Sequence, residues 1–277
     1  MARALTTFSV QWRRNAAIAI LAALAAAFAV AVYTTAVHAD GYFTGWLLFS
    51  LVLFLSCYGL RKRVTTLPIG TASTWLQWHA YAGFVTIFVF GLHIGWRVPN
   101  GIFEIALAVV FLTVAITGVA GLMLSRYLPR RLTRRGEEVI YERIPAFMTQ
   151  LREEAEKVVL EAVTETGSTV LHDFYVEKLA EFFAAPRNRL AHLVASNRSL
   201  FHLLHELGSL ERYLGPDGKE YLTRLRDLTV RKDDLDFHCA LLGALKIWVF
   251  VHVPVTSALL IGIVLHLIVV YAFTGGL

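Results

Sequence analysis

The sequence carries little charge for its length and almost no cysteine. Of its 277 residues, 17% are charged and 56% are hydrophobic, whereas a soluble globular chain carries about a quarter charged residues. The two cysteines, Cys57 and Cys239, form no C-x-x-C or C-x-x-C-H motif. Their placement excludes a covalently attached c-type haem and argues against an iron–sulfur cluster held by this chain alone.

Internal repeats, low-complexity tracts and phosphate-binding glycine loops are also missing from the sequence. Although the pI is near 9.3, the segment 126–238 holds 18 basic and 19 acidic residues and is nearly neutral. The excess of positive charge lies at the N-terminus and at 61–63, beside apolar runs. We therefore expect no nucleic-acid partner.

Long apolar runs dominate the rest of the sequence, and a helix of about 20 such residues crosses a bilayer. Five runs qualify: 15–37, 42–60, 74–96, 101–125 and 242–273. The first imitates a secretory signal, but its apolar stretch is longer than a usual signal core, so we interpret it as a membrane helix. The expected fold is an all-α integral membrane bundle of about five transmembrane helices, in contact with the lipid bilayer.

Charge asymmetry predicts the orientation of these helices. Of the 26 Lys and Arg residues, 18 lie within 126–232 and six more lie in the N-terminal and 61–63 segments, whereas the opposite loops contain Arg97 alone. By the positive-inside rule, the N-terminus and the segment 126–238 are expected inside and the C-terminus outside. A bacterial-type inner (cytoplasmic) membrane is the expected location.

Three parts are expected along the chain: transmembrane helices one to four in 1–125, an inner-side helical insert in 126–238, and the fifth transmembrane helix in 239–277. Apolar periodicity within the insert predicts helices over 138–163, 170–184, 187–213 and 219–230. Their apolar faces must be buried, either against one another in a self-contained cap or against a partner protein. Amphipathic spacing alone does not separate these two interpretations.

Four of the ten histidines lie deep in the expected membrane helices. His79 and His93 share the third helix, His252 and His266 share the fifth, and each pair is separated by 14 residues. Fourteen residues at ~100° each return to within about 40° of the same face and rise about 21 Å. Each helix therefore presents two imidazoles on one side, one near each membrane surface.

The third and fifth helices are expected to run in the same direction, because one spanning helix separates them. His79 would then match His252 in depth on the inner side, and His93 would match His266 on the outer side. Two neutral imidazoles that face each other are what bis-histidine ligation of a haem iron requires. The pattern predicts two non-covalent b haems, the inner one bound by His79 and His252 and the outer one by His93 and His266.

Two other interpretations of these histidines are open. Each could be an isolated polar group bonded to a neighbouring helix, although identical spacing on two helices is then unexplained. A metal transporter would need ligands that converge on one site, whereas the pairs stand about 21 Å apart by helix rise. Its path would also need carboxylates, and the only acids near a span are Asp40 and Glu104.

Smaller features near the histidines agree with a flat macrocycle against the backbone. Gly83 lies one turn after His79, although ordinary helix packing also favours small residues. Three basic residues near the membrane surfaces are candidates to pair with haem propionates or to anchor the helices: Arg97, Arg126 and Lys246.

These residues resemble the dihaem membrane cytochrome b family, in particular the N-terminal four-helix haem bundle of cytochrome b in quinol–cytochrome c reductases. His79-Ala80-Tyr81-Ala82-Gly83 and His93-Ile94-Gly95-Trp96-Arg97 look like that family's second bundle helix, and His252-Val253-Pro254 and His266-Leu267 look like its fourth. The resemblance covers roughly half of the chain. The first helix is extra, the insert 126–238 has no counterpart, and the Pro-Glu-Trp-Tyr quinol-oxidation motif is missing, so electron bifurcation is not implied.

The resemblance implies an electron-transfer subunit of an oxidoreductase complex rather than an enzyme alone. Such a subunit would pass electrons between a quinone pool and a partner redox subunit, with quinone or quinol as a further ligand. His38 and Asp40 are candidates for a quinone site by proximity alone. The alternative function is a membrane anchor or scaffold without haem that recruits a partner through its helical insert.

Overall fold

A computed structural model of the chain describes residues 40–63, 71–132, 140–194 and 196–273, together with 17–18, 20–21 and 24–25. Across these residues the chain forms helices and no strand, which confirms the all-α expectation for this part of the molecule. Among the helices of the described residues, three are long and apolar enough to cross a membrane. They are α2 (Asp40–Arg63), α4 (Ile102–Leu132) and α10 (Pro216–Phe273).

The other two expected spans are not among these three helices. The first, 15–37, lies almost wholly outside the described residues. The third corresponds to α3 (Ala72–His93), a helix of 22 residues that is long enough to cross a bilayer but is not one of the three candidate membrane spans. The polar side chains of Gln77, His79 and His93 lower its hydropathy.

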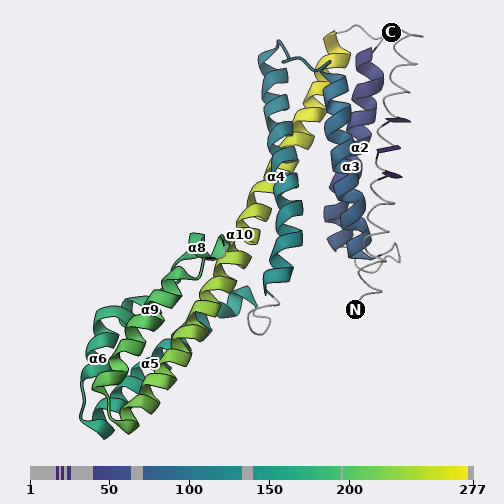
Figure 1. The fold of residues 1–277 in the computed structure, drawn as a ribbon. Coiled ribbons are helices and arrows are strands. Elements are labelled where there is room, and N and C mark those ends of the chain that lie inside the picture. The colour runs from purple at the N-terminus through teal and green to yellow at the C-terminus, as the bar shows by residue number, and fades with distance from the viewer. Residues whose placement is uncertain are drawn as a thin grey trace. The chain divides into compact units, whose positions relative to one another are not determined.

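The chain divides into two compact units. The first comprises 1–123 and 249–277 and contains α2, α3, most of α4 and the end of α10; the second comprises 124–248 and contains the insert (Figure 1). The expected boundary at 238 falls inside α10, which runs unbroken for 58 residues.

The four helices of the first unit share a small apolar core, drawn from α2, α3, α4 and α10. Its buried members are Leu48, Val52, Val89, Phe111 and Leu259. The rings of Phe90 and Phe111 stack with centroids 4.0 Å apart, which joins α3 to α4. Each helix thus contributes an apolar stripe to the same interior, as in a helix bundle.

The ends of α3 are set by local chemistry. At its start, the Thr71 hydroxyl accepts a hydrogen bond from the Thr74 backbone N–H at 3.3 Å, which caps the first turn. At its end, Gly95 and Trp96 adopt positive φ angles of 61° and 55°. The Trp96 indole then folds back onto Gly91, where a Cβ would lie only 2.7 Å from the ring. Because Gly91 has no side chain, it leaves the space that the Trp96 ring occupies in this turn.

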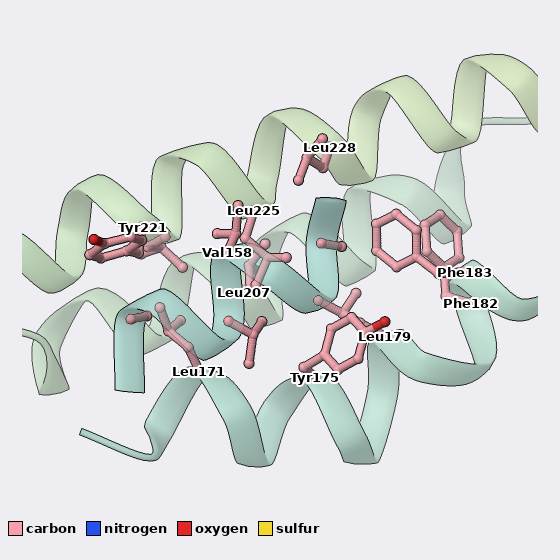
Figure 2. Packing of buried hydrophobic residues seen from close by; sticks show 14 of the residues in the cluster. Val158, Leu171, Tyr175, Leu179, Phe182, Phe183, Leu207, Tyr221, Leu225 and Leu228 are labelled. Carbon is pink, nitrogen blue, oxygen red and sulfur yellow. The ribbon is translucent and has the colours of Figure 1, made fainter. Parts of the chain in front are cut away.

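The second unit is a helical bundle with its own core. Its helices are α5 (Ile144–Thr166), α6 (Val170–Phe174), α7 (Ala180–Ala184), α8 (Arg189–Leu193), α9 (Arg198–Ser209) and the first part of α10. Short 3-10 helices lie at Tyr141–Arg143 and Leu210–Tyr213, and a π-helix at Tyr175–Leu179 joins α6 to α7. Figure 2 shows apolar side chains such as Val158, Leu179 and Leu225 meeting between these helices. The predicted apolar faces are buried against one another, so they no longer argue for a partner protein.

Two of the expected insert helices need correction. The helix expected over 187–213 is broken, because α8 ends at Leu193 before α9 begins at Arg198. Asn188, with a φ of 56°, precedes the first residue of α8. The helix expected over 219–230 is part of α10. Pro216 starts α10, where a missing N–H costs nothing.

Candidate functional site

His93 and His266 lie at one apolar cavity in the first unit. The cavity has a volume of about 420 Å³ and is lined by residues of α2, α3, α4 and α10, and small-molecule sites span roughly 300–1,000 Å³. The two imidazoles, from α3 and α10, are close enough to interact electrostatically. Near the same cavity, the Trp46 indole N–H donates to the Tyr271 hydroxyl at 3.0 Å, which ties α2 to the end of α10.

His79 and His252 form a second pair between the same two helices. Their rings are also close enough to interact electrostatically. The ring of Tyr58 on α2 lies beside His79, with centroids 5.2 Å apart. The structure therefore brings the four histidines together as His79 with His252 and His93 with His266, which is possible only because α3 and α10 run in the same direction.

Three of the four imidazoles have their Nδ1 atom held by a partner on another helix. His79 Nδ1 lies 3.1 Å from the Leu55 carbonyl oxygen on α2. His93 Nδ1 lies 3.0 Å from the hydroxyl of Thr44 on α2, and His252 Nδ1 lies 2.9 Å from the hydroxyl of Thr117 on α4. The ring of His266 instead stacks on Phe103, with centroids 6.3 Å apart.

One of these bonds assigns a ring proton. A carbonyl oxygen only accepts, so His79 must donate from Nδ1. The Thr44 hydroxyl lies within hydrogen-bond distance of both His93 Nδ1 and the Gly41 carbonyl oxygen. The Thr117 hydroxyl lies within the same distance of His252 Nδ1 and of the carbonyl oxygens of Thr113 and Val114. A hydroxyl that donates to its carbonyl accepts from the imidazole Nδ1–H, and metal-ligating histidines are usually held in this way.

A Thr-Gly pair faces a histidine in two places. Besides the bond from Thr44, a Cβ added at Gly45 would lie 3.3 Å from His93 Cε1. Besides the bond from Thr117, a Cβ added at Gly118 would lie 3.6 Å from His252 Cε1. Sequence reasoning missed both pairs, although the repeated dipeptide on the two helices without ligand histidines was a usable signal.

The other predicted site residues lie apart from these contacts. A Cβ at Gly83 would meet no atom within 4 Å, so this position is open, as a flat ligand against the backbone would need. Arg97 is exposed in the turn after α3. Arg126 and Lys246 belong to the second unit, where the Lys246 ammonium lies 3.8 Å from Glu142 and 4.8 Å from the Tyr141 ring centroid. Their role toward propionates stays a prediction.

A buried ionic cluster lies in the second unit, outside the apolar part of α10. Lys232 and Asp236 are both fully buried, with Nζ donating to Oδ2 at 2.6 Å and to the Ala185 carbonyl oxygen at 2.9 Å. Burial raises the pKa of Asp236 to about 6 and lowers that of Lys232. His192 Nε2 lies 3.6 Å from Asp233 Oδ1 beside this pair. The cluster therefore joins the segment around α8 to the helix α10.

No group of three or more His, Cys, Asp or Glu side chains in the described part of the chain is arranged to hold a bare metal ion. His202 on α9 lies 3.3 Å from Glu206. Comparison of the chain with protein-family models, with curated proteins and with solved structures found no match. The argument for function therefore depends on the residues themselves.

Proposed function

We propose that this chain is a dihaem membrane cytochrome b that carries electrons as a subunit of an oxidoreductase complex. One observation carries the proposal: His93 and His266, on two different helices, both line a single apolar cavity of small-molecule size. The Nδ1 contacts of His79, His93 and His252 support it, because a metal-ligating histidine usually has its other ring nitrogen held by such a partner.

The residues present fit b haems without covalent attachment. His93 and His266 would hold one group, and His79 and His252 would hold the other. Haem b would supply the reversible one-electron chemistry of its iron. This chain's residues fix the imidazoles, through Thr44, Thr117 and the Leu55 carbonyl, and exclude water with an apolar wall.

The membrane arrangement belongs to the same proposal. Five spans, with the N-terminus and the insert inside and the C-terminus outside, are supported by the three membrane-length helices and by the charge asymmetry of the loops. The quinone pool and a partner redox subunit are the proposed exchange partners, because no second redox motif is present in the sequence.

The decisive experiment is haem quantification on the purified full-length protein. Two non-covalent b haems per chain are expected after acid–acetone extraction and in the dithionite-reduced spectrum. His79→Ala and His252→Ala should each remove the same haem, and His93→Ala and His266→Ala should each remove the other. Folded protein without haem would instead support the membrane scaffold. Matching spectra for His79→Ala and His266→Ala would refute the pairing.

A further inference from the structure

The short helix α8 lies beside the end of a membrane-length helix. Leu193 of α8 packs against a cluster formed by Leu128 of α4 and by Phe237 and Leu241 of α10, with Leu124 also in contact. The apolar span of α4 runs from Ile102 to Pro129, so the α4 residues in this cluster are themselves span residues. The position of α8 is therefore at the level where the apolar part of α4 ends.

Hydrogen bonds fix α8 at this place. Arg131, two residues beyond the end of the α4 span, donates from its guanidinium to the carbonyl oxygens of His192 and Leu193 at 3.2 and 3.1 Å. The same guanidinium lies over the ring of Tyr127, 4.7 Å from its centroid. The His192 side chain is buried next to Asp233. The segment is thus held rigidly against the two long helices.

The outward side of α8 is strongly apolar. Leu190 is 79% exposed and Val194 is 75% exposed. Residues at i and i+4 share one helix face, and both are two residues from the buried His192, so they lie on the opposite side of α8 from it. Arg189, the residue before Leu190, is also exposed. Apolar side chains beside an arginine, next to the end of a span, are the composition of an interfacial segment.

We propose that α8 is a lipid-binding segment, in which Leu190 and Val194 enter the leaflet at the end of α4 and Arg189 faces the phosphates of anionic lipids. The inference needs only that α4 spans the bilayer and does not depend on haem. The insert would then be attached to the membrane surface through α8, without a partner protein.

Site-directed spin labelling tests this in the full-length protein in nanodiscs of phosphatidylcholine and phosphatidylglycerol. In a background of Cys57→Ala and Cys239→Ala, a nitroxide is attached at Leu190→Cys or Val194→Cys. The matched control is Leu160→Cys, on α5 and 67% exposed. His192 and Leu193, which hold α8, stay unchanged in all variants.

Accessibility to oxygen relative to a water-soluble nickel complex is then compared among the labelled sites. We expect the oxygen-to-nickel ratio at positions 190 and 194 to be several-fold higher than at 160. It should fall at 190 when phosphatidylglycerol is omitted. A ratio at 190 and 194 equal to that at 160 would place α8 in water and overturn the proposal. Exclusion of both reagents would mean that protein covers α8, which overturns it as well. An unchanged ratio in pure phosphatidylcholine would overturn the role given to Arg189.

Discussion

Gly45 offers a graded test of the outer histidine pair. A Cβ at this position would lie 3.3 Å from His93 Cε1, and carbon atoms in contact prefer about 3.5–4.0 Å. Gly45→Ala therefore asks His93 to move by a few tenths of an ångström. Gly45→Val places two further methyl groups beside the same ring, and overpacking of this kind costs about 1–3 kcal/mol.

That free-energy cost should weaken haem retention. If the imidazole must stay in place to bind iron, 1–3 kcal/mol corresponds to roughly 5- to 150-fold weaker retention at one of two sites. We expect Gly45→Val to hold close to one haem per chain, with Gly45→Ala in between it and the unsubstituted protein. The assay is haem quantification and redox titration on the full-length protein after gel filtration.

A control for Gly45 lies on the same helix. A Cβ at Gly59 would meet no atom within 4 Å, so Gly59→Val should keep both haems. On α4, a Cβ at Gly118 would lie 3.6 Å from His252 Cε1, which is an ordinary contact distance. Gly118→Ala should therefore reduce haem retention less than Gly45→Ala does. Two haems with unaltered spectra in Gly45→Val would refute the reasoning, as would loss of both haems from protein that keeps its helicity.

Two further predictions concern hydrogen bonds in the two units. Thr117→Val removes the hydroxyl that is the hydrogen-bond partner of His252 Nδ1 and should weaken haem retention at that site about 10- to 100-fold. The rate of haem transfer to a scavenging apoprotein measures this, and the control Thr113→Val should leave that rate unchanged. Lys232→Met leaves the Asp236 carboxylate buried without its cation and should cost about 3–5 kcal/mol at about pH 8. Because the pKa of Asp236 is raised from 3.8 to about 6, its carboxyl stabilises the fold when protonated, and this contribution is lost as the pH rises through about 6. The destabilisation caused by Lys232→Met should therefore be smaller at about pH 5 than at about pH 8. Hydrogen exchange in the insert core of the full-length protein measures this destabilisation. An equal value at both pH values would refute the reasoning.

The part of the site that depends on helix periodicity could be predicted from the sequence. The 14-residue spacing of His79 to His93 and of His252 to His266 is a local property of one helix, so shared faces follow directly from the helical repeat. The partners of these rings could not be predicted in the same way. Thr44 and Thr117 reach the rings from other helices, and their rotation about the helix axis depends on packing that no local pattern reports.

The insert shows the same division between local and tertiary effects. Its apolar periodicity correctly indicated helices, but the charged run 231–238 resembles a loop, and it is helical because Lys232 and Asp236 pair one turn apart in a buried setting. The break between α8 and α9 was missed. The helix α8 ends at Leu193 and α9 begins at Arg198, although the flanking apolar residues continue a helical pattern.

The cavity, more than the hydrogen bonds, distinguishes haem binding from a scaffold role. Bonds from Thr44, Thr117 and the Leu55 carbonyl would satisfy isolated intramembrane histidines equally well, so they agree with either function. Histidines that only bond to neighbouring helices would not require a cavity beside them, because helix interiors pack to high density. Here His93 and His266 share the wall of a cavity of about 420 Å³ with apolar side chains of all four helices. A large flat ligand between the two imidazoles would occupy this space.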